Sequence, residues 1–184
     1  MSQSELEARI ARLEAREDIR ALPARYGLAI DDRDIDALRE LFAENSSVRS
    51  KDGVLNAVGR EAVIDQYHGR FAVLGPTFHV AHDHLIWFED NDERARGMVT
   101  SHAEVVRNGQ PLLAAMRYED AYVREDGTWR FADRLLWFFY YMDVTEYASG
   151  LVDSQRQRAY GDRRPADFPE PLATWRAYHP GGDA

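Results

Sequence analysis

The hydrophobic pattern changes its period at residue 77, and this change constrains the fold more than any other feature of the sequence. Before it, apolar residues recur every three or four positions, as they do in amphipathic helices. After it, apolar and polar residues alternate over long segments, which is typical of strands. Helices followed by a run of strands predict an α+β domain whose helices pack on one face of the sheet.

Three helices are expected before the sheet, near residues 5–31, 34–43 and 59–72. The first contains Pro23, which lacks the amide hydrogen that a helix interior needs. A kink, or a junction of two helices, is therefore expected at that position. A small hairpin is expected around residues 52–53, where Asp-Gly separates two short apolar segments.

Four long strands are expected at residues 77–89, 95–107, 112–124 and 129–142. Asn-Gly at 108–109 and Asp-Gly at 126–127 lie between the last three of them. Both dipeptides favour two-residue hairpin turns, because these turns need positive φ at both positions. A curved, mostly antiparallel sheet is therefore expected over residues 77–143.

The length and composition favour one folded domain followed by an arm. The chain has 184 residues, and aromatic residues make up 11% of it, which argues against disorder. Residues 1–143 are expected to form the domain. Residues 144–184 include a proline-rich run that does not suit regular structure, so they are expected to pack on their own subunit or on a neighbouring one.

The charge and the residue types exclude several classes of protein. A net charge of −9 is unfavourable for binding a phosphate backbone, so no nucleic-acid partner is expected. No apolar run approaches the length of a membrane span, so no membrane partner is expected. Cysteine is absent, which excludes a thiolate nucleophile or metal ligand. The charged N-terminus does not resemble a signal peptide, and a cytoplasmic location is expected.

Asp31, His79, His102 and Tyr26 are the candidates for chemistry. Asp31 closes the first helix, where the helix dipole disfavours a carboxylate by roughly 0.3–1 kcal/mol, so a partner such as a buried histidine is expected. His79 begins one long strand and His102 lies in the middle of the next. From the residues alone, each histidine is better explained as a hydrogen-bonded core residue. Tyr26 is likewise explained by packing on the helix stripe.

A metal site is the weaker alternative. On an ideal strand His82 and His84 share one face, and two histidines near acidic residues could bind zinc or iron. We favour the interpretation that they are ordinary sheet-surface residues. No P-loop, GxGxxG or EF-hand motif is present, so neither a metal nor a cofactor is expected.

Four segments together resemble the SnoaL-like branch of the nuclear-transport-factor-two-like superfamily. They are residues 26–38 (YGLAIDDRDIDAL), 77–79 (TFH), 117–120 (RYED) and 126–131 (DGTWRF). This superfamily includes scytalone dehydratase, bile-acid dehydratase, hexachlorocyclohexane dehydrochlorinase and ketosteroid isomerase. The resemblance covers about residues 5–143 and implies a cone-shaped, curved sheet with three N-terminal helices covering one face.

The resemblance also implies site residues. Asp31 and His79 match the Asp–His pair of the dehydratases and the dehydrochlorinase, and Tyr26 matches the tyrosine that precedes the aspartate in the bile-acid enzyme. His102 is similar to the second active-site histidine of scytalone dehydratase. That enzyme has an asparagine where this chain has Tyr118.

Other departures from scytalone dehydratase concern substrate choice. Ile30 and Ser50 stand where that enzyme has tyrosines, which argues against scytalone as the substrate. The basic residue that the dehydrochlorinase carries near its last hairpin is matched only loosely, by Arg124.

The aromatic run at residues 135–142 is apolar on both strand parities, so it is expected to be covered on both sides. Trp137 and Phe138 are both candidate wall residues, together with Tyr118. The two hairpin turns place Tyr118 opposite Leu135 and place His102 on the other face of the sheet. The resemblance places both in the cavity, so a bulge or a longer turn is expected in one hairpin.

These features predict a cofactor-independent lyase, a dehydratase or a retro-aldol-type enzyme. Its substrate would be a hydrophobic cyclic or aromatic small molecule, and proton transfer would use the Asp–His pair. The alternatives are a polyketide cyclase or ketosteroid-type isomerase, and a binding module without catalysis. A homo-oligomer, either a trimer or a dimer, is expected because one face of the sheet would otherwise be exposed.

Overall fold

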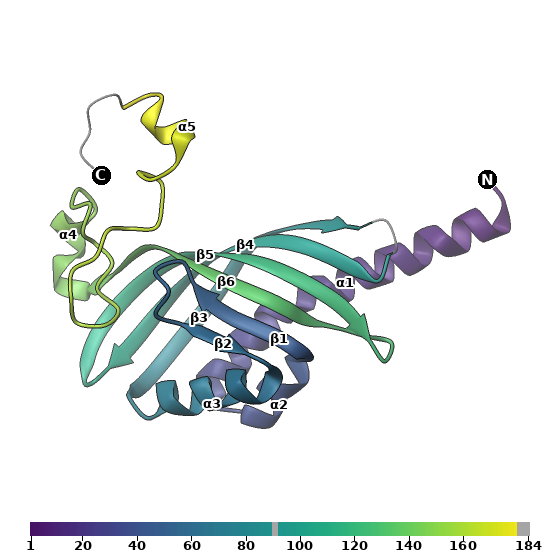
Figure 1. Ribbon diagram of the computed structural model, residues 1–184, viewed down its shortest axis with the longest axis horizontal. Coiled ribbons are helices and arrows are strands. Elements are labelled where there is room, and N and C mark those ends of the chain that lie inside the picture. Colours follow the sequence, from purple (N-terminus) through teal and green to yellow (C-terminus); the bar gives the residue numbers. More distant parts are fainter. Residues whose placement is uncertain (90–91, 180–184) are drawn as a thin grey trace.

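The computed structural model describes residues 1–89 and 92–179 (Figure 1). The elements are α1 (Gln3–Asp32), α2 (Ile35–Leu41), β1 (Phe42–Ser50), β2 (Asn56–Val58), α3 (Arg60–Phe71), β3 (Leu74–Phe88), β4 (Arg94–Arg107), β5 (Gln110–Glu125), β6 (Thr128–Asp143), η1 (Val144–Glu146), α4 (Tyr147–Gly150) and α5 (Ala173–Arg176). Within the described part of the chain, no helix is both long and apolar enough to cross a membrane.

The six strands form one curved sheet in the order β2-β1-β6-β5-β4-β3. Every neighbouring pair is antiparallel except β1 and β6, which run parallel. Helices α1, α2 and α3 lie on one face of the sheet, called here the inner face (Figure 1). The expected α+β architecture, with a mostly antiparallel sheet and its helices on one side, is therefore confirmed.

Helix α1 is a single helix of 30 residues. It begins at a capping box in which the Ser2 side chain accepts a hydrogen bond from the Glu5 amide, and the Glu5 carboxylate accepts one from the Ser2 amide. The helix continues through Pro23, so of the two alternatives expected there, a kink or a junction of two helices, the junction is wrong. Pro23 is buried, and neighbours such as Leu22 and Tyr26 pack on the sheet, which offsets the lost backbone hydrogen bond.

The tight turns are as expected. Asn108, Gly109, Asp126 and Gly127 all have positive φ, between 50° and 78°, as two-residue hairpin turns of this type require. The hairpin around residues 52–53 is also present, because β1 and β2 pair on either side of it. The second helix ends at residue 41, two residues earlier than expected, and the chain passes directly into β1.

The expected irregularity lies in the β5–β6 hairpin, where the register shifts twice. One shift falls between the pairs that contain Ala121 and Tyr122, and it moves the partner of Tyr118 from Leu135 to Leu136. The β4–β5 hairpin has no such shift, and His102 lies opposite Ala115. The prediction of a bulge in one hairpin is thus confirmed.

The arm, described over residues 144–179, packs along the second half of β6. Strand β1 pairs with β6 only as far as Leu136, so the following backbone groups of β6 need other partners. The arm supplies them. Asp167 bonds Phe138 through both its backbone amide and its side chain, and residues 156 and 158 bond the backbone of Tyr141.

A buried ion pair crosses the inner face between β5 and β6. Arg134 donates two hydrogen bonds, of 2.8 and 2.9 Å, to the Asp120 carboxylate, and both side chains are fully buried. The guanidinium carbon lies 4.1–4.3 Å from the ring centroids of Tyr26, Tyr118 and Phe131. This pair holds the aromatic side chains of α1, β5 and β6 in one packed layer.

Gly97 gives a direct test of the packing on the inner face. A Cβ atom at this position would lie 2.8 Å from the Tyr122 ring and 3.0 Å from the Leu85 carbonyl oxygen. Gly97→Ala should therefore lower the free energy of unfolding by about 1–3 kcal/mol, measured by urea denaturation. Gly69→Ala is the matched control, because nothing lies within 4 Å of the added atom in helix α3. It should raise stability by about 0.5–1 kcal/mol. Equal stability of Gly97→Ala and the natural chain would contradict the packing described.

Candidate active site

Asp31 and His79 form the expected pair. Asp31 lies in the last turn of α1, and His79 lies near the start of β3 on the inner face. Their side chains meet at 2.6 Å between Asp31 Oδ1 and His79 Nδ1. The predicted hydrogen bond is therefore confirmed. Gly27 of α1 packs closely on this strand, and a Cβ added there would be in van der Waals contact with the Cβ of His79, at 3.4 Å.

Asp31 accepts more than one hydrogen bond. The backbone amide of His79 donates to Oδ2 at 2.8 Å, and the Thr77 hydroxyl donates to Oδ1 at 2.7 Å. Burial favours the neutral acid, but these bonds and the one from the His79 ring together hold the pKa of Asp31 below its usual value. Asp31 is therefore an anion that fixes both the backbone and the ring of His79.

His79 is held as a neutral imidazole. Burial lowers its pKa below the usual 6.5, and the hydrogen bond and charge of Asp31 offset only part of that effect. The nearby charges of Arg70 and Arg33 lower it further. Because Nδ1 faces an anionic acceptor, Nδ1 carries the proton and Nε2 is left as the basic nitrogen.

His79 and Tyr26 line a cavity enclosed between the helices and the inner face of the sheet. Its wall consists of Tyr26, Ile30, Tyr67, Arg70, Leu74, His79, Val105, Met116, Tyr118, Leu136, Phe138 and Tyr141. The free volume is about 20 Å³, which is room for about one water molecule. A substrate can enter only if wall side chains move.

The exposure of the wall indicates where the cavity opens. Arg70, Leu74 and His79 are partly exposed, whereas every other wall residue is buried. These three residues belong to the end of α3 and the start of β3. We call this part of the wall the mouth. Inside it, the Tyr26 hydroxyl is 2.8 Å from that of Tyr67, so the two phenols form a buried hydrogen-bonded pair.

His102 does not join the cavity, and the expectation that it does is wrong. Its side chain is exposed on the outer face of the sheet, where Nδ1 lies 2.8 Å from Nε2 of His82. The reason is the regular β4–β5 pairing, which leaves His102 on the side opposite Tyr118. The bulges of the neighbouring hairpin lie on β6 and do not change the parity of β4.

His82 and His84 do not lie on the same face of the sheet. The alternative of a metal site assumed that they do, and that assumption is wrong. The β3–β4 register shifts between the pairs containing Ala81 and His84, so His84 turns inward. Its Nε2 lies 3.0 Å from the Tyr122 hydroxyl, and burial lowers its pKa to about 4. Among residues 1–89 and 92–179, no group of three or more potential metal ligands comes together.

The bulge also decides which aromatic residues line the cavity. Phe138 and Tyr118 belong to its wall, whereas Trp137 lies on the outer face with the Lys51 ammonium 4.4 Å from its ring centroid. The expectation that Trp137 lines the cavity is therefore wrong. On the same outer side, Phe139 packs on Phe168 of the arm. The aromatic run is thus covered on both sides, as its composition predicts.

Sequence reasoning missed Tyr67 and Arg70, which α3 contributes to the wall. Tyr67 lies on the apolar stripe of α3, so the hydrophobic pattern predicts only that it packs in the core. Arg70 stands one residue before the end of α3, where a basic residue is explained by the helix dipole. Its three-residue spacing from Tyr67 places both on one helix face, but only the packing of α3 on the sheet reveals what that face meets.

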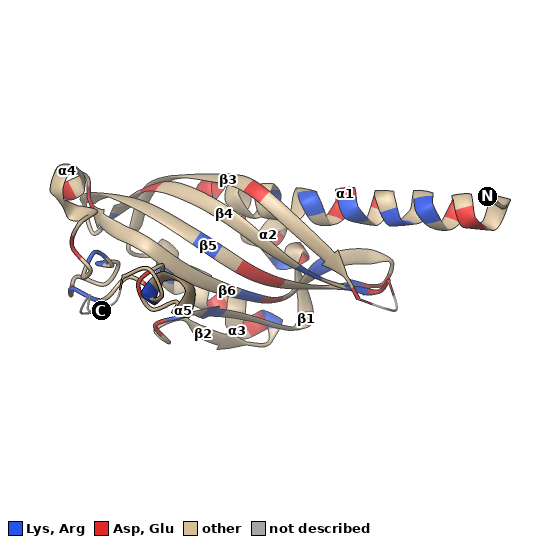
Figure 2. Ribbon diagram, turned by 90° about the horizontal axis from the view of Figure 1, so that it is seen from above, with Lys and Arg blue, Asp and Glu red and all other residues tan. Residues whose placement is uncertain are grey.

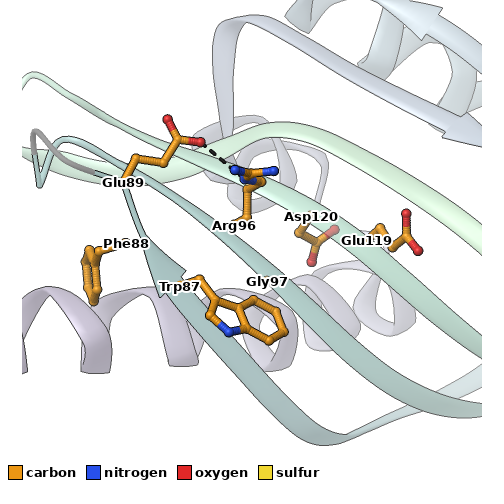
Figure 3. Close-up of a pocket in the computed structure, with 7 residues that line it drawn as sticks. All are labelled: Trp87, Phe88, Glu89, Arg96, Gly97, Glu119 and Asp120. Atoms are coloured by element: carbon orange, nitrogen blue, oxygen red, sulfur yellow. Dashed lines mark ion pairs between the residues drawn. The ribbon is translucent and has the colours of Figure 1, made fainter.

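A second, larger hollow lies elsewhere on the sheet (Figure 3). Its volume is about 740 Å³, and it is lined by Trp87, Phe88, Glu89, Arg96, Gly97, Glu119 and Asp120. Figure 3 shows Glu89 and Arg96 facing each other, and their side chains form an ion pair of 3.3 Å. Asp120 is already paired with Arg134. This hollow has no counterpart of the Asp31–His79 pair.

The model of the SnoaL-like domain family matches residues 11–135. This match covers most of the chain and includes both Asp31 and His79. The chain therefore belongs to the SnoaL-like domain family. Sequence comparison with proteins of curated function finds no match.

Solved structures confirm the fold. A type 2 hexachlorocyclohexane dehydrochlorinase (LinA) superposes with a TM-score of 0.68 at 20% identity, covering 73% of this chain and 92% of the other. A proposed scytalone dehydratase from Novosphingobium aromaticivorans gives a TM-score of 0.65 at 22% identity, covering 71% and 88%. A type 3 dehydrochlorinase from Novosphingobium barchaimii gives 0.67 at 20%, covering 73% and 93%. At these identities the likeness establishes the shared fold alone.

Proposed function

We propose that this protein is a cofactor-independent lyase that eliminates water, or a small aldehyde in a retro-aldol step, from a hydrophobic cyclic or aromatic molecule. The observation that carries the proposal is the pair of a neutral His79 and an ionised Asp31 at the wall of an apolar cavity. The family and the names of similar structures, which include a dehydrochlorinase and a proposed scytalone dehydratase, support a small-molecule reaction of this kind.

In the proposed elimination, Nε2 of His79 removes a proton from the substrate. The electron pair of the broken C–H bond forms a double bond, and the C–O bond to the neighbouring carbon breaks. The leaving hydroxide takes a proton, so that water is released. Asp31 stabilises the imidazolium that forms on His79, because it already accepts the Nδ1 hydrogen bond.

Tyr26 is the proposed hydrogen-bond or proton donor to the leaving oxygen. It lines the same cavity, and its hydroxyl is bonded to that of Tyr67, which can return a proton to it. His102 has no part in this scheme, since it lies on the outer face. Phe138 and Tyr118 form the apolar wall against which a flat ring would pack.

The hydrogen bonds of Asp31 favour an elimination by His79 over an isomerisation in which the acid acts directly as base. Both carboxylate oxygens of Asp31 accept hydrogen bonds from Thr77 or His79. Such bonds lower the basicity of a carboxylate. The free Nε2 of His79 is then the stronger base at the cavity wall.

The proposal is tested by kinetics on a panel of hydroxylated cyclic and aromatic compounds, with release of water followed by mass spectrometry. His79→Gln should lower kcat/KM by about 10²–10⁴-fold. Asp31→Asn should also lower it, and the double variant should be little worse than His79→Gln, because the two residues act as a unit. kcat/KM should rise with pH through the lowered pKa of His79 and then level, because the neutral ring is the base.

Two matched variants control this experiment. Asp32→Asn removes the same charge from the exposed neighbour of Asp31, and His102→Gln removes a histidine outside the cavity. Both should retain full activity. Losses that multiply in the double variant would contradict a coupled pair. A folded protein that binds compounds of the panel and converts none of them would favour a binding module.

We also propose that the protein forms a homo-oligomer, a dimer or a trimer, through the outer face of the sheet. Figure 2 shows mostly uncharged residues along the sheet, with a few charged segments that include a basic and an acidic one on β5. Phe78, Leu85 and Trp87 on β3 are each more than half exposed. Large exposed apolar side chains on one sheet face are often covered by a partner, and the partner proposed here is a second copy of the chain.

Light scattering at micromolar concentration should therefore give the mass of a dimer or trimer. Phe78→Ser combined with Trp87→Ser should shift the mass toward the monomer, because the covered apolar area is lost. Val152→Ser is the control, since Val152 is an exposed apolar residue of the arm and not of β3. A monomeric natural chain would refute the proposal.

A further inference from the structure

Arg70 is the one cation of the cavity wall, and no acidic group balances it. Among the described residues, no carboxylate lies within ion-pair distance of its guanidinium, and the side chain makes no hydrogen bond. Its nearest polar surroundings are phenols, because Tyr26, Tyr67 and Tyr141 share the cavity wall with it. Arg70 is only partly exposed and the wall around it is largely apolar, and a charge in such surroundings is normally paired with an opposite one.

The wider field around the mouth is also positive. The charged groups whose fields act on His79 are Asp31, Arg70 and Arg33, which are one anion and two cations. Arg33 donates its hydrogen bonds to neutral acceptors, the Thr77 hydroxyl and the carbonyl oxygens of Ile30 and Gly75. The anion Asp31 is already engaged by His79. An added negative charge at the mouth would therefore be stabilised, although the whole chain carries a net charge of −9.

The position of Arg70 fixes which end of a ligand it would hold. Arg70 and Leu74 are partly exposed at the mouth, whereas Tyr118 and Phe138 are buried at the far side of the same cavity. A ligand with an acidic group and an apolar ring would therefore enter with the ring toward the aromatic wall. Its acidic group would remain at the mouth beside the guanidinium, whose forked donors suit a carboxylate.

We propose that Arg70 binds a carboxylate of the substrate, so that the substrate class is a cyclic or aromatic acid and not a neutral hydrocarbon alcohol. This inference rests on the proposed lyase function for its substrate. It concerns ligand binding only, and it can therefore be tested without turnover. Arg70 is a specificity-determining residue in this proposal, and His79 remains the base.

Benzoate and benzamide are the probes, because they have nearly the same shape and differ in charge. Their affinities can be measured by NMR titration of the natural chain, with the ring signals of His79 as the reporter. Benzoate should bind about 10- to 100-fold more tightly than benzamide, as expected for a hydrogen-bonded charge pair. Arg70→Gln should remove this preference. Arg70→Lys should retain part of it, because lysine keeps the positive charge but lacks the paired N–H donors of a guanidinium.

Arg107→Gln is the matched control. It removes the same charge from the same side of the molecule, where Arg107 lies over the ring of Tyr160 and outside the cavity wall. The benzoate preference should survive this change. It should also persist between pH 6 and pH 9, because a guanidinium stays charged over that range. A preference that fades as pH rises would instead indicate binding to a protonated His79 and would overturn the inference.

Equal affinities in the natural chain, no binding of either probe, or a preference that survives Arg70→Gln would each overturn the inference. These outcomes are separate from a failure of the lyase proposal. If Arg70→Gln removes the preference and no compound is turned over, the acid-binding site stands and only the lyase proposal fails. If a neutral compound is turned over and benzoate is not preferred, the lyase proposal stands and this inference fails.

Discussion

The contact between Asp31 and His79 is the interaction on which the site depends. It joins the end of the longest helix to the start of the first long strand, through two residues that are 48 positions apart along the chain. Asp31 bonds the ring, the backbone amide and the neighbouring Thr77, so it fixes the imidazole in position as well as in protonation state. A carboxylate at a helix C-terminus is unfavourable alone, and these three hydrogen bonds compensate for that position.

Most of the fold could be predicted because it is encoded locally. The change of hydrophobic period, the two turn dipeptides and the helix stripes depend on residues that are close in sequence. The pairing of Asp31 with His79 was also predictable, from the misplaced charge and the family resemblance. The faces on which His84 and Trp137 lie were not predictable, because they depend on bulges. The turn dipeptides do place His102 on the face opposite Tyr118, and only the family resemblance placed it in the cavity. The position of a bulge depends on how the strands of the whole sheet bend and twist together. No short sequence segment specifies it.

The cavity combines rigid and adjustable parts. Its far side is set by the buried Arg134–Asp120 pair and the aromatic rings packed around it, whose loss would leave an uncompensated charge in the core. The mouth is formed instead by partly exposed side chains, including Arg70 and Leu74. Because the free volume is only about 20 Å³, opening must come from these mouth residues and not from the aromatic layer. The same residues then control which substrates are admitted.

The most direct test of this account is the protonation state of the His79 ring, measured by ¹⁵N NMR at neutral pH. The account predicts a neutral ring with the proton on Nδ1 and none on Nε2, and a pKa below 6.5. It also predicts that Asp31→Asn lowers the pKa further, since Asp31 partly offsets the effect of burial. A proton on Nε2 with Nδ1 bare, or an imidazolium at pH 7, would contradict the assignment of His79 as the base.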